Sequence, residues 1–204
     1  TVSMHAGNNT EAWSPVIGHM LMMAVTLPID DLSAIPAGRN GRCNAMQTLD
    51  RALLNDILPA KAFQRMSAFG ALSDEFVDHV LAEGELLGLT EGEQLYHQGE
   101  RADCFYVVLK GCLEVYQDTA TGREVIHTTC EGESIGFAAM LAMRPRLFSS
   151  VATGECIALK IPCQVLASLP ELDGEQFGIF FINLSRDMSR FMGDCIQRLP
   201  AANI

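Results

Sequence analysis

One stretch of the chain, residues 132–151, holds the residue types that can bind a phosphate group. It opens with Gly-Glu-Ser-Ile-Gly, continues through a short apolar run, and ends with Met-Arg-Pro-Arg-Leu-Phe-Ser-Ser-Val. Free backbone N–H groups at the start of a helix attract anions, and an arginine adds a charged, forked donor. Two serine hydroxyls follow directly. The stretch therefore predicts an anion-binding loop with one arginine as its cation.

The overall charge argues against a nucleic-acid partner. The chain has 204 residues, with 14 Lys and Arg against 25 Asp and Glu, which gives a net charge of −11. Binding to a phosphate backbone draws on an electropositive face, so general DNA or RNA binding is disfavoured. A small anionic effector needs only one well-placed arginine. The length suits one well-filled domain plus an extension, or two small domains.

The cysteines and the apolar runs indicate in which cellular compartment the protein is expected. The seven cysteines are odd in number, contain no CxxC, and show no spacing typical of zinc or iron–sulfur sites. They predict buried, reduced thiols, with redox sensing as the alternative. The longest apolar run, 16–27, is too short to span a membrane, and no Lys or Arg precedes it as in a signal peptide. We expect a cytoplasmic protein without a membrane partner.

The hydrophobic period changes twice along the chain. Residues 1–45 have no usable period, and we interpret them as an extension of unclear role. A helical period follows from 48 to 84, with Ser73 as the N-cap of its last helix and Gly84 at its end. From 85 onward the period is two, in short segments separated by turns, including a five-residue hairpin loop at 118–122. The predicted strands are 85–89, 94–97, 104–109, 112–117, 124–130, 148–153 and 157–161.

The last element, about 173–199, has the clearest helical period, after a short helix at 163–169. Its apolar residues recur at alternating intervals of four and three, the spacing of a coiled-coil seam. We expect the helix to form a homodimer through this seam; the alternative is packing on its own β body. The seam residues are Phe177, Phe181, Leu184, Met188, Phe191 and Cys195.

The order of these parts, helices, then a β-roll broken by one short helix, then a long helix, resembles the cyclic-nucleotide-binding domain superfamily. The matching motifs are Leu-Thr-Glu-Gly-Glu-Gln-Leu-Tyr-His-Gln-Gly-Glu at 89–100, Cys-Phe-Tyr-Val-Val-Leu-Lys-Gly-Cys-Leu-Glu-Val-Tyr at 104–116, and the stretch from 132 to 151. The resemblance is to catabolite-activator and FNR-type sensor domains without a helix-turn-helix module. It implies a mainly β fold with helices, a double-stranded β-helix or jelly roll, in a domain over 46–204. Its β-roll would cover about 84–161, and its terminal helix, used for dimerisation, about 171–199.

The resemblance also implies a binding site. In the family, a cassette glutamate holds the ribose 2′-hydroxyl and an arginine pairs with the cyclic phosphate. Here Gly136 matches the family glycine and Arg146 follows Pro145 as the family arginine does, but Phe137 stands in place of the glutamate. A different anion or an apolar effector therefore stays open beside cyclic AMP or cyclic GMP. The implied ligand-binding residues are Gly136, Phe137, Ala138, Ala139, Arg146, Ser149 and Ser150.

These observations lead to a functional prediction with two alternatives. The chain is expected to be a ligand-sensing regulatory domain in signal transduction, a homodimer that acts on an unidentified protein partner. The first alternative is a module of the same fold that binds no nucleotide and serves protein interaction. The second is a haem or redox sensor, although His79, His97 and His127 are dispersed and predict no metal site. No catalytic motif occurs in the sequence, so we do not expect an enzyme.

Overall fold

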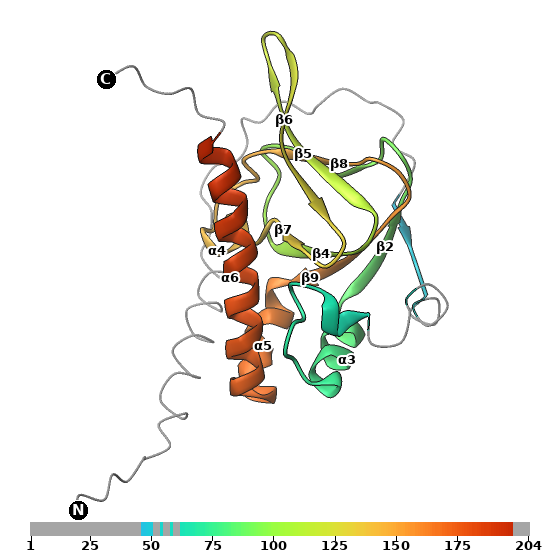
Figure 1. Ribbon diagram of the computed structural model, residues 1–204, viewed down its shortest axis with the longest axis vertical. Coiled ribbons are helices and arrows are strands. Elements are labelled where there is room, and N and C mark those ends of the chain that lie inside the picture. Colours follow the sequence, from blue (N-terminus) through green and yellow to red (C-terminus); the bar gives the residue numbers. More distant parts are fainter. Residues whose placement is uncertain (1–45, 51–53, 55–57, 59–61, 198–204) are drawn as a thin grey trace, which may run out of the picture.

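The body of the protein is a β-roll made of two antiparallel sheets (Figure 1). The computed structural model describes residues 46–50, 54, 58 and 62–197; the predicted extension 1–45 and most of the helix expected near 49–58 lie outside them. One sheet has the order β1-β2-β9-β4-β7 and the other β3-β8-β5-β6. This crossing order confirms the jelly-roll prediction. The strands are β1 (Gln47–Thr48), β2 (Glu85–Leu89), β3 (Gln94–Tyr96), β4 (Cys104–Lys110), β5 (Cys112–Thr119), β6 (Gly122–Cys130), β7 (Ser134–Ile135), β8 (Ser149–Ala152) and β9 (Cys156–Pro162).

The predicted strands are all present, but two strands and one turn were not foreseen. Strands β1 and β7 have two residues each, too few to show a period of two. The prediction of a five-residue hairpin loop at 118–122 is wrong, because β5 runs to Thr119 and β6 begins at Gly122. Backbone pairing continues through polar residues there, and Gly122 supplies the positive φ of 126° that the tight turn requires.

The helix before the roll follows its predicted ends. Helix α3 (Asp74–Glu83) begins where the Ser73 hydroxyl accepts a hydrogen bond from the backbone N–H of Phe76, and it ends at Gly84. The helical period predicted from 48 to 84 does not give an α-helix between 63 and 70. Only a 3-10 turn, η3 (Phe63–Arg65), forms there, because the backbone N–H of Ala68 donates to the carbonyl of Gly132 instead of continuing a helix.

Two helices follow the roll, α5 (Cys163–Leu172) and α6 (Gly174–Gln197). Asp173 separates them, and its carboxylate accepts hydrogen bonds from the N–H groups of Glu175 and Gln176 at 3.0 Å. Helix α6 is about 36 Å long at 1.5 Å per residue and runs along the side of the roll (Figure 1).

The face of α6 that was predicted as a dimer seam packs on the body of its own chain. Phe177 and Leu184 are buried in the core, and the ring of Phe181 packs against Phe137 of the short helix α4 (Phe137–Leu141). These three residues follow the alternative expectation of packing within the chain, because a helical period reports an apolar face without naming what covers it. The homodimer itself stays a prediction. A different stripe of α6 is exposed, with Ile182, Met192 and Ile196 each more than half exposed.

Strand β4 divides the core into two clusters because its side chains alternate. Phe105, Val107 and Leu109 face the helices and join a cluster rich in phenylalanine, which includes Phe69 and Phe180. Cys104, Tyr106 and Val108 face the interior of the roll. This alternation places a thiol and a phenol inside the roll, next to the predicted anion-binding loop.

The cysteines depart from the prediction of reduced thiols at one pair. Cys112 and Cys130 lie opposite each other on β5 and β6, with their Cα atoms 4.2 Å apart, and form a disulfide. Only strand register brings them together, so spacing along the sequence did not reveal the pair. Cys104, Cys156 and Cys163 are buried thiols, and burial raises the pKa of Cys156 to about 11. In the described part of the chain, no helix combines the length and hydrophobicity needed to cross a membrane.

Candidate ligand-binding site

The predicted anion-binding loop folds as β7, then Gly136, then the short helix α4 (Phe137–Leu141). Gly136 has φ +84°, a left-handed conformation that residues with a Cβ rarely adopt. A Cβ at this position would also collide with the guanidinium of Arg146. Glycine is thus required twice, for the turn into α4 and for the close approach of the arginine.

Arg146 is turned into the protein and is only 3% exposed. Its Nη1 donates to the carbonyl of Gly136 at 2.9 Å, and its Nη2 donates to the carbonyl of Cys104 at 2.7 Å. Its Nε is buried without a hydrogen-bond partner among the described residues. None of the partners found in this part of the chain is a carboxylate. The arginine therefore holds the loop against β4 while its positive charge has no counter-charge there.

The aromatic neighbours of Arg146 leave that charge uncompensated. The guanidinium carbon lies 4.5 Å from the ring centre of Tyr96 and 5.6 Å from that of Tyr106, and the two rings stack 5.9 Å apart. Burial raises the pKa of Tyr96 to about 12 and the pKa of Tyr106 further still, so both phenols are neutral at physiological pH. Burial also raises the pKa of the Cys104 thiol, which donates to the Tyr106 hydroxyl. A bound anion would supply the missing negative charge.

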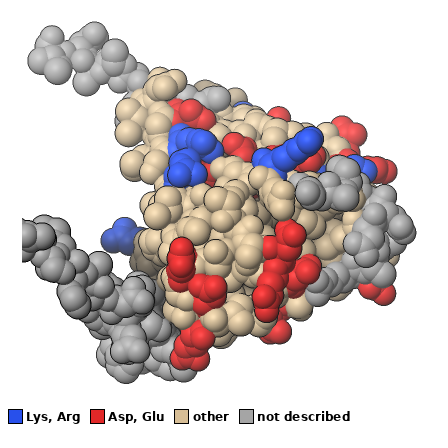
Figure 2. Space-filling view, turned by 60° about the horizontal axis from the view of Figure 1, so that its bottom comes forward, with Lys and Arg blue, Asp and Glu red and all other residues tan. Residues whose placement is uncertain are grey.

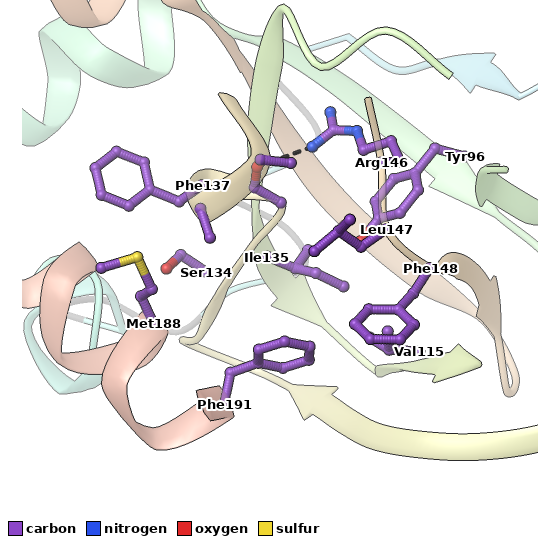
Figure 3. A pocket seen from close by; sticks show the side chains of 13 residues that line it. Tyr96, Val115, Ser134, Ile135, Phe137, Arg146, Leu147, Phe148, Met188 and Phe191 are labelled. Carbon is purple, nitrogen blue, oxygen red and sulfur yellow. Dashed lines mark hydrogen bonds between the residues drawn. The ribbon is translucent and has the colours of Figure 1, made fainter. Parts of the chain in front are cut away.

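A pocket of about 80 Å³ lies beside this arginine, between the loop and α6 (Figure 3). That volume has room for several water molecules. Five of the seven predicted residues border it: Gly136, Phe137, Ala138, Ala139 and Arg146. The other lining residues are Tyr96, Val115, Ser134, Ile135, Leu147, Phe148, Met188 and Phe191. The pocket thus combines one charged end with largely apolar walls.

Phe137 stands where the resemblance implies a ribose-binding glutamate. Its side chain is 2% exposed, and its ring packs edge-on against Phe105 at 5.3 Å and against Phe181 at 5.7 Å. These contacts join α4 to β4 and to α6. The residue that would read the ribose has become part of the core.

The two predicted serines do not reach the pocket. The Ser149 hydroxyl accepts a hydrogen bond from the backbone N–H of Gln98 at 3.0 Å, and Ser150 is fully buried in β8 opposite Tyr96. Both lie on β8, between β3 and β5. Their role as phosphate ligands stays a prediction, although neither lines the pocket beside Arg146.

Sequence reasoning missed the contribution of β3 and α6 to the pocket. Tyr96 comes from β3, and alternation along that strand could have placed it inside the roll. Met188 and Phe191 lie on the predicted apolar face of α6, but nothing in the sequence says that this face closes a pocket. Phe148 follows Arg146 closely and could have been included with the loop.

Helix α6 is also tied to the loop by a buried carboxylate. Asp187 accepts hydrogen bonds from the backbone N–H of Ser134 at 2.9 Å and from its hydroxyl at 3.1 Å. It also accepts one from the hydroxyl of Ser67 and pairs with Arg190 at 3.2 Å. The described residues contain no group of three or more His, Cys, Asp or Glu side chains able to hold a metal ion.

Comparison with known proteins identifies the family. Residues 86–172 match the family model of the cyclic nucleotide-binding domain. This match confirms the resemblance seen in the sequence for the segment 86–172. The match covers the roll from β2 to the end of α5, including the loop and the pocket residues other than those of α6.

Solved structures of the same fold agree with this assignment. A cyclic nucleotide-binding domain from Methylobacillus flagellatus superposes with a TM-score of 0.62 at 22% identity, covering 76% of this chain and 88% of that one. The catabolite activator protein of Thermus thermophilus gives a TM-score of 0.55 at 20% identity, covering 65% and 61%. A putative cyclic nucleotide binding protein from Ruegeria pomeroyi is 26% identical with a TM-score of 0.50, covering 70% and 66%.

Curated relatives match part of this chain and a smaller part of their own length. Human patatin-like phospholipase domain-containing protein 6 is 32% identical over 99 residues, which is 48% of this chain and 7% of that protein. The cAMP-dependent protein kinase regulatory subunit of Yarrowia lipolytica is 30% identical over 89 residues, 44% of this chain and 23% of that one. The chain thus spans less than a quarter of the length of either relative, and the similarity concerns one module.

Proposed function

We propose that the chain is a regulatory domain that senses a small anion, of the cyclic AMP or cyclic GMP kind, at the pocket beside Arg146. The observation that carries the proposal is the buried guanidinium, which has no carboxylate partner in the described residues and borders a pocket formed by the family's binding loop. The family match over 86–172 supports a ligand-binding rather than a catalytic role. We infer no enzymatic activity.

The proposed signal passes from the pocket to α6. Met188 and Phe191 form part of the pocket wall, and Asp187 binds Ser134 immediately before the loop. A ligand that fills the pocket would therefore shift α6 relative to the roll, and α6 would act on a protein partner in signal transduction. The face in Figure 2 supports a partner other than nucleic acid, because its basic side chains form small groups flanked by acidic ones and the net charge is −11.

The proposed homodimer uses the outer stripe of α6. Ile182, Met192 and Ile196 are 57–59% exposed, and at 3.6 residues per turn they lie within an arc of roughly 80°. Sedimentation of the double variant Ile182→Glu, Met192→Glu is expected to give a monomer where the parent is a dimer. Leu172→Glu is the matched control, since Leu172 is an exposed apolar residue on α5. An unchanged sedimentation coefficient in the double variant would rule out this interface.

Calorimetric titration with cyclic AMP and cyclic GMP tests the binding function. The parent and Arg144→Met are expected to bind one of them, because Arg144 is exposed and does not border the pocket. Arg146→Met is expected to lose at least tenfold in affinity, with its folding checked by melting temperature. No binding of any anion to the parent chain would refute the proposal.

One observation favours a second function, a protein-interaction module that binds no nucleotide. Both terminal nitrogens of Arg146 already donate to backbone carbonyls, and Phe137 belongs to the core. In that case Arg146→Met would lower the stability of the protein without changing partner binding. We further propose that the protein is cytoplasmic. Disulfides are rare in that compartment, so free Cys112 and Cys130 thiols in cells, measured by alkylation, would support this location, and a disulfide in cells would count against it.

A further inference from the structure

We propose that the pocket selects an anion with an apolar body and does not read sugar hydroxyls, so that its preferred ligand is an amphipathic carboxylate. This inference rests on the proposed binding function and specifies the chemistry of the same site. Three features carry it: the unpaired charge at one end, the composition of the walls, and the exposed apolar residue at the mouth.

The charged end is built for one anionic group. Arg146 is 3% exposed, its Nε has no hydrogen-bond partner in the described residues, and no Asp or Glu lines the pocket. Tyr96 and Tyr106 stack beneath the guanidinium and are neutral at physiological pH. A carboxylate or a phosphate would balance the charge in this low-dielectric setting, where charge-assisted hydrogen bonds are strong.

The walls offer little to a sugar. Most lining side chains are apolar, among them Ile135, Leu147, Phe148 and Phe191, which are labelled in Figure 3. The Ser134 hydroxyl is already bound to Asp187 at 3.1 Å. With Phe137 in the core, no carboxylate remains to accept a bond from a ribose hydroxyl. Burying such a hydroxyl without a partner costs free energy, whereas an apolar body gains from the same walls.

The mouth of the pocket points to the same class of ligand. Leu147 borders the pocket and is nevertheless 63% exposed, directly after the buried arginine. A large apolar side chain left in water beside a pocket is a surface that an apolar ligand can cover. The neighbouring residue Phe148 is half-buried and contacts Phe191 of α6, so a ligand under Leu147 would also touch the helix.

Two matched pairs of probes test the inference on the full chain. Decanoate and decanol share an apolar body and differ in charge; cyclic AMP and 2′-deoxy cyclic AMP share an anion and differ in one hydroxyl. We expect decanoate to bind at least tenfold more tightly than decanol, and Arg146→Met to abolish that difference. We expect the two nucleotides to differ by less than threefold.

The outcomes separate this inference from the proposed function. Tight binding of cyclic AMP that weakens tenfold or more without the 2′-hydroxyl, with no binding of decanoate, would overturn the inference and keep the proposed function. No binding of any of the four probes would overturn both. Leu147→Glu serves as a second variant, because this exposed position tolerates substitution. The variant is expected to bind decanoate at least fivefold more weakly. An unchanged affinity for decanoate would count against this site.

Discussion

Asp187 should be one of the largest single contributors to the stability of the domain. Its buried carboxylate accepts hydrogen bonds from the Ser134 N–H, the Ser134 hydroxyl and the Ser67 hydroxyl, and pairs with Arg190. Truncation to alanine leaves these half-buried donors unpaired, at about 1–3 kcal/mol for each donor that water cannot reach. Arg190 is more than half exposed and can be hydrated, so losing its ion pair with Asp187 costs little stability. The expected loss for Asp187→Ala is about 3 kcal/mol.

Thermal unfolding and urea titration measure this loss directly. About 3 kcal/mol corresponds to a drop of roughly 6–12 °C in Tm for a domain of this size. Asp194→Ala is the matched control, because Asp194 lies two turns along the same helix, is half exposed, and pairs with His127 at 2.8 Å. Its expected loss is under about 1 kcal/mol. Equal losses in the two variants would refute the account of Asp187 as a buried link between α6 and the binding loop.

Three further predictions concern the loop, the disulfide and the buried phenols. Gly136→Ala should cost at least about 2 kcal/mol in urea titration, because it combines a strained φ with a collision at Arg146, whereas Gly154→Ala, with open space around it, should be neutral. Reduction of the Cys112–Cys130 disulfide releases an 18-residue loop and should cost about 3 kcal/mol, read as a lower Tm in dithiothreitol; no change in Tm would contradict it. Because the pKa of Tyr96 is raised to about 12 from 10.0, its phenol ionises first in the unfolded state, so this group alone should lower stability by about 2–3 kcal/mol as the pH rises from 10 to 12. The raised pKa of Tyr106 adds to the fall, so Tyr96→Phe should reduce its slope without removing it in unfolding measurements across this pH range, and an unchanged slope would argue against it.

The parts of the fold that follow a period of two could be predicted from the sequence, and the contacts between elements could not. Strand β4 alternates its side chains, and glycines with positive φ such as Gly111 mark the turns. Arg146 and Gly136 stood out because a glycine turn and a Pro-Arg pair are local signals. Phe191 did not, since an apolar helix face shows that something covers it without showing what. The Cys112–Cys130 pair depends on strand register, which residue spacing does not reveal.

The replacement of the family glutamate by Phe137 changes how the loop is connected as well as what it can bind. Asp187 holds Ser134 just before Gly136, and Phe181 holds Phe137 just after it, so α6 contacts the loop on both sides of the glycine. Arg146 binds the carbonyl of that same glycine. An anion that draws the guanidinium away from Gly136 would therefore act at the point where both links to α6 meet. A glutamate at 137 could not make the ring contact with Phe181, so the phenylalanine couples the loop to the helix more tightly than a glutamate would.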